Sequence, residues 1–153
     1  IDMPDVRNFL GQDWKKIESD VNGEWSLYLI MDQFLNSTVE SKRAAAGWAG
    51  DRYSFYEGPK AGDALLVQLS AWDTEGDARE FFEAYAKRTI KRYPNATEPI
   101  QASVDSQHES ASWKTTEGEV VLERRGNRVL LIEGLPEAPN RAGIIKSLWG
   151  RNN

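Results

Sequence analysis

The stretch Ala44–Gly58, with the sequence AAAGWAGDRYSFYEG, constrains the fold of this 153-residue chain more than any other stretch. Gly47 and Gly50 bracket Trp48 directly after a run of alanines. Because glycine adopts positive φ and lets another backbone approach closely, the pair predicts a helix end followed by a tight turn, with positive φ at one glycine at least. The aromatic run Tyr53–Tyr56 then favours a strand. This stretch predicts architecture and carries no signature of a chemistry.

Composition narrows the class of protein. A length of 153 residues suits one domain with a substantial core. The net charge of −5 argues against nucleic acid or an anionic membrane as the main partner. No apolar run is long enough for a transmembrane segment, and the lack of cysteine excludes disulfides and thiolate chemistry. Since the sequence begins with Ile1, we expect any targeting segment to lie upstream of it.

Hydrophobic periodicity, caps and turn residues predict an order of helices and strands. The expected helices are Pro4–Leu10, Asn22–Leu35, Thr38–Ala46, Thr74–Tyr93 and Asn140–Gly150. The expected strands are Asp51–Glu57, Asp63–Trp72, Gln107–Thr115, Glu119–Arg125 and Arg128–Glu133. Residues 25–31 also fit a strand, but the length of the run and the acid in its first turn favour a helix. We expect residues 14–18 to form a short strand or extended arm, and residues 95–105 to form a loop.

These elements predict an α+β fold. Residues 1–153 should form one α+β domain with a mostly antiparallel sheet of about five strands and helices packed on one face. The helix Thr74–Tyr93 should be the main helix over the sheet. Its capping box joins Thr74 and Asp77, and its apolar face includes Phe82.

The sequence holds few candidates for catalysis. His108 is the only histidine, and a triad with Asp105 and a neighbouring serine would place adjacent strand residues on opposite faces. We therefore expect no catalytic residue, no zinc site and no cofactor. Calcium is the metal that the sequence excludes least, because the many acids offer oxygen ligands. The basic helix end, residues 87–92, is expected to be solvated. No phosphate-binding glycine motif is present.

Carboxylates and aromatic rings leave two further hypotheses open. Asp51, Glu57, Asp73 and Asp77 are expected to hold turns and helix ends, with Asp51 and its neighbour Arg52 tying down the glycine corner. The alternative is a hydrolase with carboxylate chemistry near Asp51 and Asp73. The high tryptophan count predicts a tryptophan-rich core, or else an aromatic platform for a sugar or small ligand. The candidate ligand-binding residues are Trp48, Asp51, Arg52, Tyr56 and Trp72.

The chain also resembles a known kind of domain. GWAGDRY (residues 47–53) and WDTEGDAREF (residues 72–81) are similar to the patterns small-GW-x-GDRY and W-[DT]-x-x-x-DA-x-EF of an uncharacterised domain in exported bacterial and archaeal proteins. The opening LGQDWKKIESDVNGEW and the late run EVVLERRGNRVLLIEGLP extend the resemblance over nearly the whole chain. In that family the domain often lies C-terminal to a larger peptidase-like region. The resemblance implies an extracytoplasmic location, and it brings no catalytic residue or cofactor.

Together these observations favour a non-catalytic exported domain that binds or supports a neighbouring domain or protein. The alternatives are the aromatic small-ligand or sugar-binding module and the carboxylate-based hydrolase. The sequence names no ligand for any of them.

Overall fold

The computed structural model describes residues 1–137 and 140–150. Over these residues the strands form one antiparallel sheet of seven, in the order β1-β2-β3-β7-β6-β5-β4. The strands are β1 (Lys15–Asp20), β2 (Trp48–Glu57), β3 (Ala64–Trp72), β4 (Ile100–Asp105), β5 (His108–Thr115), β6 (Gly118–Arg125) and β7 (Arg128–Leu135). The helices are α1 (Arg7–Leu10), α2 (Gly23–Leu35), α3 (Thr38–Ala45), α4 (Glu75–Arg92) and α5 (Arg141–Gly150).

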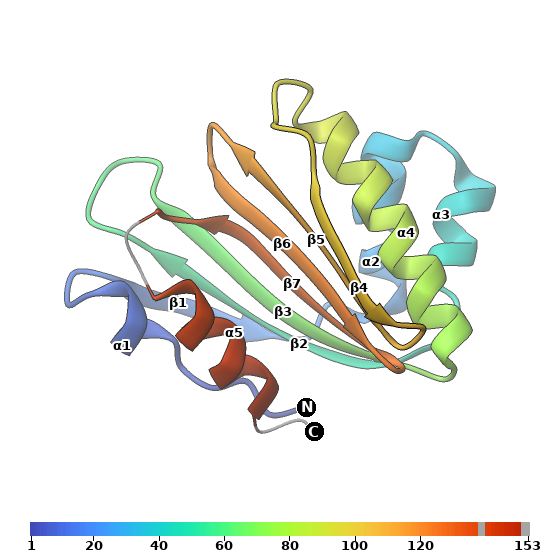
Figure 1. Cartoon of the computed structure of the whole chain (residues 1–153), viewed down its shortest axis with the longest axis horizontal. Helices are drawn as coiled ribbons and strands as arrows, with labels where there is room; N and C mark the ends of the chain where they lie inside the picture. Colours follow the sequence, from blue (N-terminus) through green and yellow to red (C-terminus); the bar gives the residue numbers. More distant parts are fainter. Residues whose placement is uncertain (138–139, 151–153) are drawn as a thin grey trace.

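Helices cover both faces of this sheet (Figure 1). One face packs against α2, α3 and α4 in a core that includes Leu27, Met31, Trp72, Phe81, Trp113 and Leu122. We call it the helix-bearing face, because it carries these three helices. The other face packs against α5 and the N-terminal segment in a second core that includes Val6, Tyr56, Leu65, Ile132, Ile144 and Trp149. The α+β class and the antiparallel sheet are confirmed. The expectation of about five strands with helices on one face is wrong, because seven strands form the sheet and each of its faces has its own helices.

The two additional strands are the two edges of the sheet. β1 was expected only as a strand or extended arm, and β4 lies in the expected loop. All six residues of β4 are exposed, as are five of the six in β1. β1 shows no clear alternation, and β4 alternates Ile100, Ala102 and Val104 with polar residues only within a short, turn-rich segment that buries neither face. Pairing with β2 and β5 creates these strands.

The expected helices are present, with shifts of up to three residues at their ends. α2 buries Leu27, Met31 and Leu35, which agrees with the helical reading of this run. The capping box of α4 is complete: the Asp77 backbone N–H donates to the Thr74 hydroxyl, and the Thr74 backbone N–H donates to the Asp77 carboxylate. This cap fixes the start of α4 and with it the position of its C-terminal turn.

Strand register arranges the helix-bearing face in rows. Trp48 lies opposite Trp72 in a row beneath the helices, and Phe55, Leu66 and Glu133 form another row across β2, β3 and β7. The first row is part of the core, whereas Phe55 is only partly buried. The Phe55 row therefore marks a part of the face that the helices leave open.

Candidate functional site

The glycine corner brings two distant motifs together. Gly47 has a φ of +77°, which confirms the expected positive φ. A β-carbon on Gly47 would lie 2.5 Å from Cγ of Asp77, the residue that caps α4. The Asp73 backbone N–H also donates to the Gly47 carbonyl (2.7 Å). The motifs at residues 47–53 and 72–81 therefore meet at one corner, where they join the start of β2 to the start of α4.

Asp51 connects this corner to a second helix. Its carboxylate accepts hydrogen bonds from the backbone N–H groups of Asn22 and Gly23, at 3.0 and 2.9 Å, where α2 begins. It also accepts from Nε1 of Trp48 at 3.0 Å and from Nε2 of Gln68 at 3.3 Å. A carboxylate at a helix N-terminus satisfies free N–H groups and complements the helix dipole. Asp51 thus caps α2, whereas the side chain of Asn22 at the N-cap position makes no capping hydrogen bond.

The five candidate ligand-binding residues lie on both faces of the sheet. Trp48, Asp51 and Trp72 are on the helix-bearing face. Arg52 pairs with Leu69 and Tyr56 with Leu65, so both lie on the face covered by α5, and Arg52 does not tie down the corner with Asp51 as expected. Ligand contact by these residues stays a prediction.

Within this set, Trp72 and Tyr56 are buried and hydrogen-bonded inside the protein. The Trp72 indole N–H donates to Ser70, and the Tyr56 hydroxyl accepts from the backbone N–H of Val6. Burial raises the pKa of Tyr56 above its ordinary value. These contacts give both rings structural roles.

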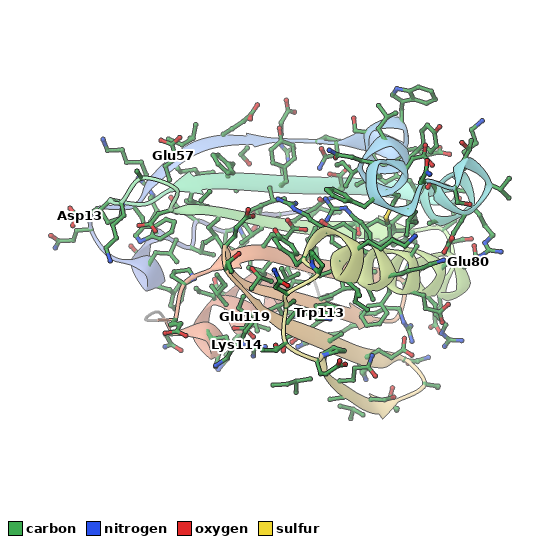
Figure 2. All side chains as sticks on the ribbon, turned by 90° about the horizontal axis from the view of Figure 1, so that it is seen from above. Asp13, Glu57, Glu80, Trp113, Lys114 and Glu119 are labelled. Atoms are coloured by element: carbon green, nitrogen blue, oxygen red, sulfur yellow. The ribbon has the colours of Figure 1, made fainter. Side chains whose placement is uncertain are left out.

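The other titratable candidates lie apart from one another. His108 is exposed, and its Nδ1 lies 2.8 Å from an Asp105 carboxylate oxygen in the turn between β4 and β5. Glu57 lies at the end of the sheet away from α2, α3 and α4 (Figure 2). Across the residues that the structure describes, no group of three or more histidines and acids could hold a metal ion. Within the same residues, no helix is long and apolar enough to cross a membrane.

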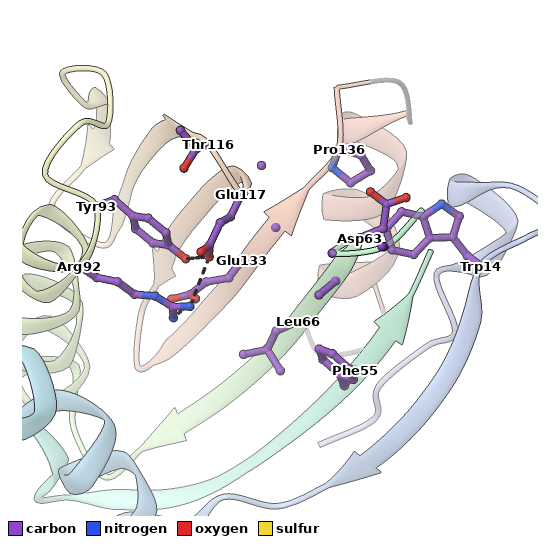
Figure 3. A pocket seen from close by; sticks show the side chains of 15 residues that line it. Trp14, Phe55, Asp63, Leu66, Arg92, Tyr93, Thr116, Glu117, Glu133 and Pro136 are labelled. Atoms are coloured by element: carbon purple, nitrogen blue, oxygen red, sulfur yellow. Dashed lines mark hydrogen bonds and ion pairs between the residues drawn. The ribbon is translucent and has the colours of Figure 1, made fainter. Parts of the chain in front are cut away.

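A groove of about 680 Å³ lies on the uncovered part of the helix-bearing face (Figure 3). We call it the open-face groove. Phe55, Leu66 and Glu133 lie on its floor, and Arg92 and Tyr93 at the C-terminal end of α4 line one side. The other lining residues are Trp14, residues 61–64, residues 116–118, Gly134 and Pro136. Its volume is within the range of small-molecule sites.

A buried charge network, formed by Tyr85, Arg88, Arg92 and Glu133, supports the groove. One Glu133 carboxylate oxygen accepts from the Tyr85 hydroxyl and from Nη1 of Arg88, the latter at 2.8 Å. The other oxygen accepts from Nη1 of Arg92 at 2.7 Å. Side-chain exposure is 4% for Arg88 and 8% for Glu133, so each buried charge is paired, as burial requires.

The network sets the electrostatics of the groove wall. Burial, and then the negative charge of Glu133, raises the pKa of Tyr85 well above its ordinary value, and the same two causes raise the pKa of Tyr93. Both phenols therefore remain hydrogen-bond donors at neutral pH. Arg92 keeps 32% of its side chain exposed to the groove. The wall thus presents fixed donors next to an apolar floor, an arrangement suited to binding and orienting a ligand.

Sequence reasoning did not find this site. The basic residues at the end of α4 were expected to be solvated, but Arg88 is buried and Arg92 is half-buried. The available signal was Glu133 at the end of the apolar run VLLI, where a buried acid requires a cationic partner. Sequence alone does not show that α4 and β7 meet.

The most exposed tryptophan is not one of the candidate ligand-binding residues. Of the six tryptophans, all within the described residues, four are buried, Trp48 is half-buried and Trp25 is 68% exposed. The Trp25 ring centre lies 5.2 Å from that of Tyr28, beside a shallow hollow of about 590 Å³ that Glu24 and Lys42 also line. Among the described residues, the most exposed tryptophan therefore lies on α2, and the one at the glycine corner, Trp48, is half-buried.

Comparisons with known proteins identify a family. A family model described as "Domain of unknown function (DUF8575)" matches residues 10–143. No curated protein and no solved structure has a significant match to the chain. The matched range includes the glycine corner, the open-face groove floor and the buried charge network.

Proposed function

The chain belongs to the family described as Domain of unknown function (DUF8575), and from that premise we propose that it is a non-catalytic exported domain that binds a partner domain or protein. The proposed site is the open-face groove. The observation that carries this proposal is that Phe55 and Leu66 lie only partly buried on the groove floor, beside the side wall formed by Arg92 and Tyr93. An apolar floor with a few oriented polar groups is the usual composition of a binding site.

The charges of the groove support binding over catalysis. Glu133 accepts from three donors, and Arg92 is paired with it at 2.7 Å. A general base needs a free lone pair directed at its substrate, whereas these groups hold one another in place. The groove wall is therefore pre-organised, which reduces the entropy lost when a partner segment binds.

A groove-filling variant tests this proposal. Ala64 is exposed and lines the groove, so Ala64→Trp should fill the floor while keeping a strand-compatible residue. Ala102 is exposed on β4 and makes Ala102→Trp a matched control away from the groove. Peptides selected from a random decapeptide display library on the wild-type chain should bind the control normally and lose binding to Ala64→Trp. Binders that are indifferent to Ala64→Trp, or a library that yields no binder, would contradict the proposed site.

The exported location has a separate basis and a separate test. It rests on the resemblance to domains of exported proteins, and it is part of the proposal. Fractionation of source cells, with antibody raised against this chain, should detect it outside the cytoplasmic fraction. Recovery with cytoplasmic markers alone would contradict this part and leave the groove proposal intact.

A second candidate function is an aromatic sugar-binding module, and the exposure of Trp25 favours it. Trp25 and Tyr28 form an accessible ring pair, with Glu24 and Lys42 at the edge of the hollow as hydrogen-bonding groups. Sugar rings stack their C–H faces on such rings. Titration with cellohexaose and chitohexaose should then change tryptophan fluorescence in the wild type and not in Trp25→Ala. Unchanged wild-type fluorescence with both sugars would count against this candidate.

A further inference from the structure

Two donors at the end of α4 converge on one exposed carboxylate oxygen. Nη2 of Arg92 lies 3.5 Å from Oε2 of Glu117, and the Tyr93 hydroxyl donates to the same oxygen at 3.2 Å (Figure 3). Glu117 lies in the turn between β5 and β6, and 64% of its side chain is exposed. Arg92 and Tyr93 thus form a carboxylate-binding pair that is occupied by a side chain of the protein itself.

Arg92 is held in position independently of Glu117, and its guanidinium packs over the Tyr93 ring. Glu133 binds Nη1 of Arg92 from the buried side at 2.7 Å. The Arg92 guanidinium also lies over two rings, 4.9 Å from the centre of Tyr93 and 5.9 Å from that of Phe34. Removing Glu117 from its place therefore leaves the pair oriented toward the groove. Because exposed ion pairs contribute little free energy, a second carboxylate can displace Glu117 at small cost.

The apolar floor begins beside this pair. Glu133 lies opposite Leu66, and Leu66 lies opposite Phe55, so the floor runs from the pair across β7, β3 and β2. A ligand with its carboxylate on Arg92 and Tyr93 would place the adjoining atoms over Leu66 and Phe55. The ligand therefore needs a terminal carboxylate followed directly by apolar groups.

We propose that the open-face groove binds the free C-terminus of a partner polypeptide with apolar final residues, and that Glu117 is the intrinsic competitor for its carboxylate. This inference rests on the proposed function and names the segment that the groove receives. Capture of a terminal carboxylate by fixed donors is an established mode of peptide recognition. A peptide fits better than a fatty acid, because the lining includes Asp63, Thr116 and Glu117, whereas an acyl chain requires a long apolar lining.

A matched pair of peptides tests the inference. Acetyl-Ala-Ala-Leu-Phe with a free C-terminal carboxylate and the same peptide as its C-terminal amide are titrated into isotope-labelled protein, with binding followed by backbone amide NMR shifts. The free acid should bind about tenfold more tightly or better, as expected for a hydrogen bond to a charged group. Shifts should concentrate at Leu66, Arg92 and Tyr93. Equal affinities for acid and amide would overturn the carboxylate inference while the proposed groove function stands.

Glu117→Gln provides the more specific result. It removes the competing charge on an exposed turn, so it should tighten binding of the free acid several-fold and leave the amide unchanged. Tyr93→Phe should weaken only the acid. An unchanged acid affinity in Glu117→Gln would contradict the competitor role. Circular dichroism establishes that both variants are folded.

Further outcomes distinguish a failure of the ligand class, of the C-terminus inference and of the proposed groove function. Decanoate that binds the groove more tightly than the peptide acid would overturn the choice of a polypeptide ligand. If neither peptide shifts any groove amide while display-selected peptides bind through the groove, the C-terminus inference fails and the proposed function stands. If no peptide of either kind binds there, both fail.

Discussion

The two ends of the helix-bearing face differ in coverage although they share strands β2 and β3. At one end, Trp72 is buried, and its ring centre lies 4.6 Å from that of Phe81 on α4. At the other end, Phe55 and Leu66 are only partly buried and line the groove. Both ends carry aromatic and aliphatic residues at alternating positions. Apolar patterning thus defines the face, and the helices placed on it decide which rows become core and which remain accessible.

The largest difference in stability should lie between alanine variants of two phenylalanines, one at each end of the face. Phe81→Ala removes a ring that is 1% exposed and should lower the free energy of unfolding by about 3–5 kcal/mol. Phe55→Ala removes a half-buried ring at the open end and should cost less than about 2 kcal/mol. Urea denaturation of both variants measures the difference. Equal losses would mean that the open end is packed as tightly as the covered end.

The next comparison uses the two carboxylates that contact Arg92. Glu133→Gln leaves Arg88 buried without its counter-charge and should cost about 3 kcal/mol or more. Glu117→Gln affects an exposed pair and should cost less than about 1 kcal/mol. Thermal and urea unfolding of both variants and of the wild type measure the loss in the free energy of unfolding. A small loss in Glu133→Gln would show that the network does not support the groove wall.

Glycine substitutions compare the covered corner with a loop at the groove. Gly47→Ala combines a φ of +77° with a clash against Asp77 and should cost about 2 kcal/mol. Gly62→Ala has a φ of +90° and nothing within 4 Å of the added carbon, so it should cost about 1 kcal/mol. Differential scanning calorimetry measures both. A milder loss at Gly47 than at Gly62 would contradict the tight contact between the two motifs.

The smallest effect should come from an exposed turn outside both regions. The hydrogen bond from His108, followed by that from the Gln107 backbone, lowers the pKa of Asp105 from its ordinary 3.8. A lowered pKa stabilises the folded state above pH 3.8, and this stabilisation is lost as the pH falls through the lowered value. His108→Ala should return the Asp105 pKa toward 3.8 in an NMR titration. Asp5, whose pKa is lowered by Arg7, is the control and should not change.

Local sequence signals determined the elements in which neighbouring residues suffice. The capping box of Thr74 and Asp77 predicts the start of α4, and Gly126–Asn127 predicts the hairpin between β6 and β7. The positive φ of Gly47 follows from the same local reasoning. Each signal acts within a few residues, because caps and turns satisfy backbone groups that are close in the chain.

Only the tertiary structure decided the remaining features. β4 buries none of its residues and exists through pairing with β5, and the two-sided helix coverage depends on where α5 packs. Asp51 caps a helix that begins 28 residues earlier, and Glu133 meets Arg88 across 45 residues. The sequence supplied the apolar residues of the groove floor, but not the wall or the uncovered position. Contacts between distant residues depend on the relative placement of whole helices and strands, which no local pattern encodes.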